Sequence, residues 1–578
     1  MTMRIITAFL ALCFSILACG QQIQIPKTTF QTNHLWRPGS DFGTEAVLVY
    51  DVNDIDGKDF ESRIKTWKIH GYEPQFMISF SWGEDLNHKF KWQTLLSGHP
   101  RMHGEVPYFI PDEKYCKDIF NRKIKRAINA DIHCIVFEEP EFYINCNPEL
   151  SDSNKCEILL QTLQYIIALT KQYAHDQRKD VYCLIATHSI FNYANWGIIS
   201  PEILLSKIPQ LDGFIGQVWQ DTAESSNDSL TTFEHAYLEY ASLAALINSN
   251  NKILYFLTDP VGDIDKSWCE YKDGYLATTV AMMMIGNINR YEILPWPHRI
   301  LEYRHPLNKL STKPVKIPED YLSLILIINQ ILRTTPTVAD KDTCNILISN
   351  EIMNSDGKGN KRIHIIERLY QQLLPIVRKG VPIRFIYKED STSIKRNNGY
   401  IYMPEILSQT NYQNITNTIN NLGIIKKNYY KTQRGNYIFT YAISDNGSAK
   451  RDVILRGKFI DILDDKLKVT SSKTVKAGNV SILYDLSSIK SSKPIILVTG
   501  TKDIIKENSD SAFIFFAYGP DKSINKQKIF LPKAPENIMI FNHDGTKISF
   551  EQNYDRRNHL LYLSFPNNHL GCRITINL

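Results

Sequence analysis

Apolar runs with the residue composition of β-strands alternate with helix-like segments between residues 47 and 296. We assign the strands to residues 45–54, 74–85, 105–111, 132–139, 180–189, 212–220, 252–260 and 289–297. Helical segments separate them, most clearly at residues 120–130, 156–174, 233–250 and 274–286. Eight strands alternating with helices over about 250 residues are typical of a (β/α)8 barrel, in which functional residues lie at the carboxyl ends of the strands.

Acidic and aromatic residues gather at these predicted strand ends. The candidate substrate-binding or catalytic residues are Asp51, Trp82, Glu138, Glu139, Glu141, His188, Gln217, Trp219, Asp259, Glu292 and Trp296. Carboxylates accept hydrogen bonds from hydroxyl groups, and indole rings can stack on the apolar faces of sugar rings. Together these residues indicate a carbohydrate-binding cleft, although no single one of them does so alone.

Each candidate also has a structural interpretation. The three glutamates can favour the start of the next helix through its dipole, and Asp259 before Pro260 can shape a turn. His188 can be a hydrogen-bonded structural residue, Glu292 can belong to a buried polar pair, and the tryptophans can be packing residues. From the sequence, both interpretations stay open for every candidate.

The pattern changes after the barrel. Strand-like and helix-like runs between residues 344 and 423 indicate a small α/β domain, and the later short strands with Gly, Asn and Asp at their turns are typical of one or two β-sandwiches. We predict a signal peptide of the lipoprotein type at residues 1–19, an α/β fold in the form of a (β/α)8 TIM barrel at 20–316, a small Rossmann-like α/β domain at 317–430 and a β-sandwich region at 431–578. A chain of 578 residues is long enough for several cores.

The N-terminus has the pattern of a targeting segment. Arg4 precedes an apolar run at residues 5–19 that is short for a membrane span and ends in small residues. Cys19 follows Ile16, Leu17 and Ala18, which resembles a bacterial lipobox and predicts lipid attachment at Cys19; simple cleavage nearby is the alternative. We therefore expect an exported protein, either a cell-surface or periplasmic lipoprotein of a bacterium or a secreted protein.

Charge and cysteine content argue against other classes of function. The chain has 66 basic and 61 acidic residues, and its formal net charge of +5 is not concentrated in a dense basic run, so we expect no nucleic-acid partner. The 10 cysteines include no Cys-x-x-Cys pair, so we predict no metal site and no cofactor. Cys146 and Cys156 either close a small loop or remain free thiols. We expect the membrane to be contacted only through the N-terminal lipid, and make no prediction of oligomeric state.

The predicted order of domains resembles that of the modular β-galactosidases and related TIM-barrel glycoside hydrolases. In many such enzymes the acid/base is a Glu at the end of strand four, often after Asn and before Pro, and the nucleophile is a carboxylate at the end of strand seven. The segment FEEP places Glu138 at the asparagine position and Glu139 at the acid/base position, and LTDP offers Asp259 at strand seven. Residues 211–219 and 290–300 are also similar to a little-characterised group of secreted barrel proteins. The resemblance implies glycoside hydrolysis of a poly- or oligosaccharide.

The leading hypothesis is therefore an exported glycoside hydrolase. Glu139 would protonate the leaving oxygen, and Asp259 would attack the anomeric carbon or activate water. Repulsion among neighbouring carboxylates would raise the pKa of one glutamate and keep it protonated. Because side chains alternate along a strand, we expect only one of Glu138 and Glu139 to face the cleft, with Glu138 in support and Glu141 as the substitute acid.

Two alternatives come from other classes of function. The first is a non-catalytic surface glycan-binding protein on a TIM-barrel scaffold, which would keep its activity without Asp259. The second is a metal-dependent hydrolase that uses Asp51, His188 and Asp259. The sequence disfavours the second because it has no His-x-His or His-Glu-x-x-His spacing.

Overall fold

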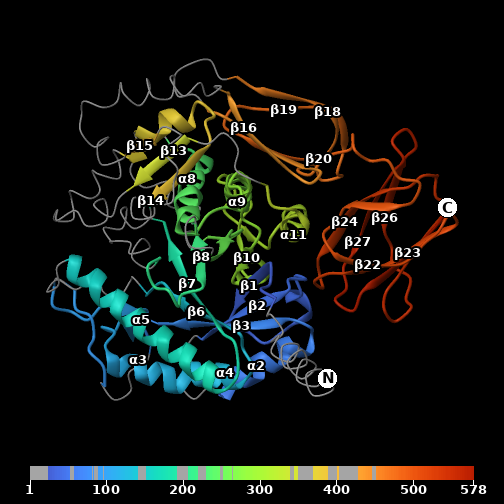
Figure 1. The fold of residues 1–578 in the computed structure, drawn as a ribbon. Helices are drawn as coiled ribbons and strands as arrows, with labels where there is room; N and C mark the ends of the chain where they lie inside the picture. The colour runs from blue at the N-terminus through green and yellow to red at the C-terminus, as the bar shows by residue number, and fades with distance from the viewer. Residues whose placement is uncertain are drawn as a thin grey trace, which may run out of the picture.

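The computed structural model describes residues 24–51, 58–80, 82–83, 89–95, 97–140, 152–189, 191, 206–218, 230–247, 252–262, 265–338, 344–348, 369–370, 372–387, 400–402, 427–444 and 451–578. Three of the predicted functional residues, Cys19, Glu141 and Trp219, lie outside the described residues. Figure 1 shows a central barrel with further β-sheets beside it, the last of them at the C-terminus.

Eight parallel strands close into the predicted TIM barrel. They are β1 (Thr28–Thr32), β2 (Ala46–Asp51), β3 (Glu73–Ser79), β6 (Cys134–Glu138), β7 (Tyr182–His188), β8 (Gly213–Gln217), β9 (Ile253–Leu257) and β10 (Tyr291–Pro295). Their order around the barrel is β1-β10-β9-β8-β7-β6-β3-β2, and β2 pairs with β1 to complete the circle. Closure leaves no strand edge without a partner.

Two of the predicted strand assignments are wrong. The first barrel strand is β1, in a stretch before residue 45 where no strand was predicted. Residues 105–111 contain only the two-residue strand β5 (Val106–Pro107), which pairs with β4 (Met102–His103) outside the barrel. Threonine suits a buried strand because it is β-branched, while proline has no N–H for a ladder. The two errors cancel in the count, so β6 is still the fourth strand and β9 the seventh.

Helices cover the outside of the barrel. They are α2 (Lys58–Ile69), α3 (Glu113–Ile119), α4 (Lys125–Asn129), α5 (Asp152–Asp176), α8 (Thr232–Ala244) and α9 (Trp268–Met283), with short turns at η2 (Phe120–Ile124) and η5 (Ala245–Ile247). The short elements η1 (Pro38–Ser40) and α10 (Pro297–Leu301) follow β1 and β10 at the carboxyl end of the barrel. Capping boxes formed by Thr231 with Glu234, and by Ser267 with Glu270, fix the starts of α8 and α9. No helix among the described residues is long and apolar enough to cross a membrane.

The barrel strands are apolar on both faces because two separate cores contact them. Alternate residues of successive strands fill the barrel interior, including Leu48, Tyr50, Met77, Val136, Ala186, Ile215, Tyr255 and Leu257. Their neighbours along the strands, such as Val49, Phe137 and Phe256, belong to the core beneath the helices. Residues in the same alternation as Leu48 and Val136 therefore face the interior. Those among them that lie near the carboxyl ends of the strands face the barrel mouth.

The region of the predicted α/β domain contains a small parallel sheet. Its strands β13 (Cys344–Ile348), β14 (Ile383–Tyr387) and β15 (Tyr400–Tyr402) lie in the order β14-β13-β15. Arg378 makes two hydrogen bonds, of 3.0 and 3.2 Å, to the buried carboxylate of Glu234 on α8. The Tyr370 hydroxyl lies 2.9 Å from Nδ1 of His235 on the same helix. These contacts attach the small domain to the barrel.

The C-terminal region contains one five-stranded antiparallel sheet and one β-sandwich. The sheet consists of β16 (Tyr429–Arg434), β17 (Tyr437–Ala442), β20 (Val480–Asp485), β18 (Val453–Asp461) and β19 (Val469–Val475). The sandwich pairs β21 (Ile495–Val498), β24 (Ile524–Phe530), β27 (Leu560–Pro566) and β26 (Glu551–Asp555) with β22 (Lys502–Asn508), β23 (Ala512–Tyr518), β28 (Cys572–Asn577) and β25 (Asn537–Phe541). Phe513, Phe515, Leu563 and Ile574 form its core.

The five-stranded sheet packs directly on the barrel helices. The ring of Tyr441 stacks on Phe233 of α8, with ring centroids 3.8 Å apart. Arg434 is fully buried and donates to the carbonyl oxygens of Met283, the last residue of α9, and of Ile288 beyond it, at 3.0 Å each. A buried arginine whose donors are satisfied by backbone carbonyls connects the sheet to the barrel.

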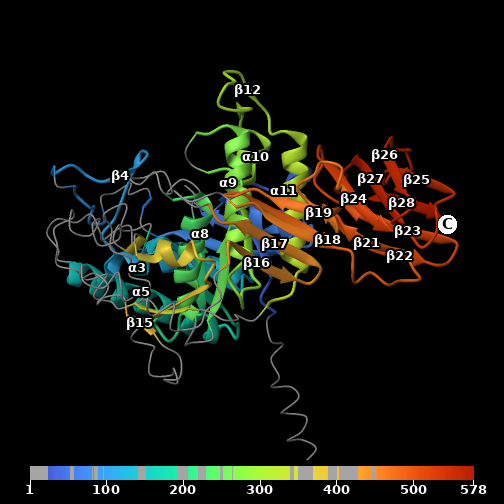
Figure 2. The ribbon, with the colours of Figure 1, turned by 90° about the horizontal axis from the view of Figure 1, so that it is seen from above.

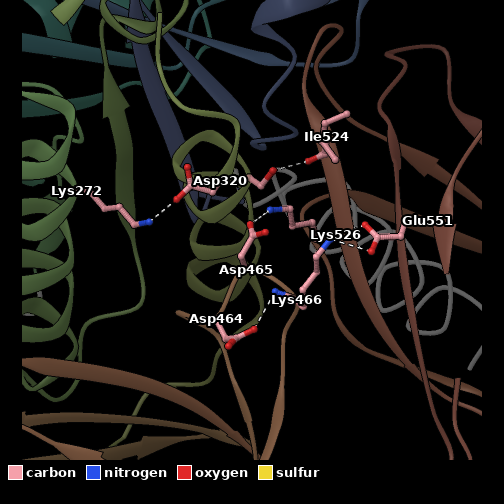
Figure 3. A network of polar contacts seen from close by, with 9 residues as sticks. Lys272, Asp320, Asp464, Asp465, Lys466, Ile524, Lys526 and Glu551 are labelled. Atoms are coloured by element: carbon pink, nitrogen blue, oxygen red, sulfur yellow. Dashed lines mark hydrogen bonds and ion pairs between the residues drawn. The ribbon is translucent and has the colours of Figure 1, made fainter. Parts of the chain in front are cut away.

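The sandwich is joined to the rest through α11 (Glu319–Thr334), which lies between the barrel and β24 in Figure 1. Figure 3 shows Lys272 of α9 beside Asp320, and the two charged groups lie 2.6 Å apart. The Ser323 hydroxyl donates to the carbonyl of Ile524 at 2.9 Å. In the same network, Lys526 of the sandwich pairs with Asp465 beside the five-stranded sheet. A short hairpin of β11 (His305–Pro306) and β12 (Pro314–Val315) projects from the barrel, as Figure 2 shows.

Candidate functional site

Glu138 and Glu139 occupy the carboxyl end of β6, as predicted. Glu138 is the last residue of the strand and shares the alternation of the inward-facing Val136. The Tyr50 hydroxyl, from the carboxyl end of β2, donates a hydrogen bond to Oε2 of Glu138. Glu138 therefore lies at the mouth of the barrel, where a tyrosine hydroxyl orients its carboxylate.

Glu139 also reaches the inward-facing groups, contrary to the expectation from strand alternation. It lies just past β6, and its φ of 38° places the backbone in the left-handed region. The backbone N–H still donates to the carbonyl of Ala186 at 3.0 Å. The side chain brings Oε1 within 2.6 Å of Nε2 of His188, the last residue of β7. The left-handed turn ends the strand alternation, so both glutamates meet side chains of the mouth.

The pair of Glu139 and His188 combines a buried and an accessible group. The His188 side chain has 0% of its surface exposed, whereas that of Glu139 has 22%. A non-glycine residue in the left-handed region is strained, and such strain is common at functional sites. The pair therefore has a fixed imidazole and a carboxylate that a ligand in the mouth can reach.

Tyr50 lies among the aromatic residues of the mouth. Its ring centroid is 6.3 Å from that of Trp82 and 5.2 Å from that of Trp296, and both indoles pack against the barrel interior. Trp296 has a φ of 54° at the start of α10, another left-handed residue beside the mouth. Burial, followed by the nearby charge of Glu138, raises the pKa of the Tyr50 phenol well above its ordinary range. Tyr50 therefore remains a hydrogen-bond donor at neutral pH.

Asp259 follows β9 and is held from two sides. Its Oδ1 accepts a hydrogen bond from the backbone N–H of Val261 at 2.9 Å, and its Oδ2 lies 3.7 Å from Nη1 of Arg299 on α10. The side chain has 11% of its surface exposed. The contact with Val261 is the turn-shaping role that the sequence left open, and the contact with Arg299 places a positive charge beside the carboxyl group.

Glu292 belongs to the buried interior rather than to the accessible surface of the mouth. It has 0% of its surface exposed and pairs along the backbone with Thr29 of β1 and Leu257 of β9. Burial raises the pKa of Glu292 to about 8, and the negative charge of Asp259 adds to this shift. The carboxyl group is therefore mostly protonated at neutral pH. This position corresponds to the buried polar interpretation. Because the Glu292 side chain is not exposed, a substrate in the mouth does not contact it.

Asp51 points away from the mouth. It follows Tyr50 along β2 and forms an ion pair with Lys123 of η2, on the helical side of the strand. Asp51 thus does not join His188 and Asp259, and the three do not form the set required by the metal-dependent alternative. Among the described residues, no group of three or more His, Cys, Asp or Glu side chains is arranged to hold a metal ion.

Gln217 is the last residue of β8 and lies opposite His188 in the β7–β8 register. It has 7% of its surface exposed. It lies on the same rim as Glu138, Glu139, His188, Trp82 and Trp296, while Glu141 and Trp219 fall outside the described residues. The structure thus brings most predicted residues to one mouth.

Sequence reasoning did not select Tyr50 or Arg299. In a strand whose two faces are both buried, the alternation does not show whether Tyr50 or Asp51 faces the interior. Arg299 lies 40 residues after Asp259, and only closure of the barrel brings α10 back to the end of β9. The sequence signal that could have identified Arg299 is its position shortly after the last predicted strand.

Comparisons with solved structures support the fold. No protein-family model and no curated protein matches the sequence. The β-galactosidase of the psychrophilic Marinomonas ef1 aligns with 79% of this chain and 100% of its own, with a TM-score of 0.51 and 7% identity. The β-galactosidase of the Antarctic haloarchaeon Halorubrum lacusprofundi aligns with 79% of this chain and 98% of its own, with a TM-score of 0.52 and 7% identity. The chain therefore has the modular TIM-barrel fold found in these glycoside hydrolases.

Proposed function

We propose that this protein is a glycoside hydrolase that cleaves O-glycosyl bonds with Glu139 and Asp259. The observation that carries the proposal is that two carboxylates at the ends of β6 and β9 each have a different basic partner. His188 Nε2 lies 2.6 Å from Glu139, and Arg299 Nη1 lies 3.7 Å from Asp259. Because β7 and β8 separate the two strands in the barrel, the two carboxylates lie at different positions around its rim. Paired carboxylates are the groups that such hydrolysis requires.

The two partners give the carboxylates different roles. Glu139 and His188 can hold one proton between Oε1 and Nε2, and the accessible Glu139 can pass a proton to the leaving oxygen. Arg299 places a positive charge 3.7 Å from Asp259 instead. Asp259 then attacks the anomeric carbon, or activates the water that does so. In this proposal the asymmetry comes from the basic partners, rather than from repulsion within the glutamate cluster.

The aromatic residues support a carbohydrate as the substrate. Trp82 and Trp296 both lie near Tyr50, with ring centroids 6.3 and 5.2 Å from that of Tyr50, and each is only partly buried. Their indole faces can pack against the C–H groups of a sugar ring, while Glu138 and Gln217 can bond to its hydroxyl groups. We assign the substrate to poly- or oligosaccharides on these grounds.

We also propose that the mature chain is exported and anchored through a lipid at Cys19. Arg4, the apolar run at residues 5–19 and the lipobox-like residues before Cys19 support this proposal. An exported polysaccharide-degrading enzyme meets its substrate outside the cytoplasm, so the location and the activity agree with each other.

The proposed activity can be tested with the purified mature chain. It should be incubated with aryl glycosides that differ in sugar and anomeric configuration and with a set of polysaccharides, followed by analysis of the products. Hydrolysis of at least one substrate class supports the proposal. Binding of a glycan without any hydrolysis favours the non-catalytic glycan-binding alternative, and the absence of both contradicts a carbohydrate function.

A further inference from the structure

A cavity of about 660 Å³ lies where the barrel, α11 and the β-sandwich meet. One wall comes from the loop after β1 and from α10 after β10, so the cavity lies at the carboxyl end of the barrel, beside the mouth. The opposite wall comes from residues 521–523 of the sandwich, and residues 316–322 form the side between them. Its volume is within the range of about 300–1,000 Å³ that is typical of small-molecule sites.

The barrel wall of the cavity presents two imidazoles. The rings of His34 and His298 meet edge to face with centroids 5.4 Å apart. Burial lowers the pKa of both residues, so both are predominantly neutral at pH 7. Nδ1 of His298 is buried and has no hydrogen-bond partner among the described residues. The wall therefore carries two uncharged imidazole rings.

One backbone hydrogen bond joins the sandwich wall to the barrel side of the cavity, and two further hydrogen bonds order the wall itself. The backbone N–H of Asp521 donates to the carbonyl of Pro38 at 3.1 Å, and Oδ1 of Asp521 accepts from the backbone N–H of His569 at 2.9 Å. Ser523 is buried, and its Oγ accepts a hydrogen bond from Asn567 at 2.9 Å. The cavity is therefore a joint feature of the two domains.

Helix α10 connects the cavity with the candidate active site. Arg299 of this helix pairs with Asp259, while His298 and Leu301 line the cavity. Trp296 lies at the start of the helix. Its ring centroid is 5.2 Å from that of Tyr50 in the mouth and 5.8 Å from that of His298. A chain-like ligand that leaves the mouth past Trp296 would thus reach the cavity next.

The charges of the lining favour an uncharged, hydroxyl-rich ligand. Three cationic and three anionic side chains line the cavity: Arg37, Lys316, Lys522, Glu302, Glu319 and Asp521. Equal numbers of both signs give no net attraction for an ion but supply donors and acceptors for hydroxyl groups. Leu35, Leu301 and Ile317 add apolar surface of the kind that packs on sugar rings.

We propose that this cavity binds the distal units of a neutral oligosaccharide whose cleaved bond lies in the barrel mouth. This inference rests on the proposed glycosidase function and extends it, because it assigns to the β-sandwich a direct part in recognising long substrates. A short substrate would occupy the mouth alone. A longer one would gain affinity from the cavity.

Gly39 offers a way to fill the cavity without touching the mouth. It lies in η1 and lines the cavity, and a Cβ added there would meet only the carbonyl oxygen of Asp521, at 3.8 Å. Gly39→Phe would place a ring between the barrel and the sandwich wall, whereas Gly39→Ala adds one methyl group at an ordinary contact distance. Gly39→Ala is therefore the matched control for the backbone change.

The experiment compares the full mature chain with both variants. Hydrolysis of an aryl glycoside that wild type cleaves reports on the mouth, and calorimetric binding of a disaccharide and a hexasaccharide of the same sugar reports on the distal units. We expect Gly39→Phe to weaken hexasaccharide binding by about tenfold or more while disaccharide binding and aryl-glycoside turnover stay within about twofold. Gly39→Ala should resemble wild type in all assays, and thermal unfolding should verify that both variants fold.

Each outcome bears on a different claim. Aryl-glycoside hydrolysis with equal hexasaccharide affinity in wild type and folded Gly39→Phe would overturn the cavity proposal and leave the glycosidase function standing. If wild type hydrolyses nothing but binds the hexasaccharide, and Gly39→Phe weakens that binding, the cavity assignment holds and the hydrolase assignment fails. A misfolded Gly39→Phe would be replaced by Leu301→Trp, which fills the same cavity from α10. Absence of hydrolysis and of glycan binding rejects both proposals.

Discussion

Replacing Glu292 with glutamine tests how a buried carboxyl group in the barrel affects stability. Glu292 has none of its surface exposed, and neither carboxyl oxygen has a hydrogen-bond partner among the described residues. Burial and then the charge of Asp259 raise its pKa to about 8. The folded chain therefore keeps this group protonated at neutral pH. Glutamine has nearly the same shape and is neutral, but it cannot ionise.

The sign of the effect follows from the two pKa values. In the unfolded chain the carboxyl group returns to its ordinary pKa of 4.5, so between pH 4.5 and about 8 the folded state binds more protons. The free energy of unfolding then falls as the pH rises. The stability present below about pH 4.5 is lost progressively up to about pH 8. At about 1.36 kcal/mol for each pKa unit, the full difference amounts to roughly 5 kcal/mol.

Denaturant unfolding at pH 5, 6, 7 and 8 measures this effect in wild type and in Glu292→Gln. The variant should lack this component of the pH dependence, and at pH 8 it should be more stable than wild type by roughly 2–5 kcal/mol. Glu551→Gln is a suitable control, because the Glu551 side chain has 54% of its surface exposed and pairs with Lys466 at the surface. Stability curves for wild type and Glu292→Gln that stay parallel from pH 5 to pH 8 would refute the reasoning.

Three further predictions concern the mouth, the domain interfaces and the location. Tyr50→Phe removes the donor to Glu138 and should lower kcat/KM on an aryl glycoside by about tenfold; an unchanged rate would exclude an orienting role for this hydroxyl. A chain ending at residue 316 loses the sheet that covers Phe233 and should be poorly soluble, whereas a soluble, fully active fragment would show that the later domains are independent of the barrel. Cys19→Ala should move the protein from the membrane fraction to the soluble fraction, and unchanged membrane association would contradict lipid attachment.

The barrel could be predicted because buried parallel strands leave a strong pattern. Runs such as residues 132–137 and 252–257 are almost entirely apolar, since the interior and the helices cover both faces. β1 was not predicted, because Thr28–Thr32 has only one large apolar residue, Phe30, and its other residues are polar. Its burial depends on β2 and β10, which a local pattern does not show.

The candidate site was predictable in its position and less so in its detail. The carboxyl ends of the strands located Glu139, His188 and Asp259, because the fold brings these ends together. The expectation that only one of Glu138 and Glu139 faces the mouth was wrong, since the left-handed backbone at Glu139 ends the strand alternation. The ion pair of Asp51 with Lys123 depends on the packing of η2 against the barrel, which sequence spacing does not reveal. The catalytic roles of Glu139 and Asp259 stay predictions.

The most direct test of the central claim is the turnover of Glu139→Gln and Asp259→Asn on a substrate that wild type cleaves. Each substitution keeps the shape of the side chain and removes its charge, so each should lower kcat by about 10³-fold or more without loss of the folded state. Asp51→Asn is the matched control, because Asp51 lies on the helical side of its strand and should leave kcat nearly unchanged. Near wild-type turnover in both Glu139→Gln and Asp259→Asn would contradict the account, and a loss confined to Glu141→Gln would move the acid to residue 141.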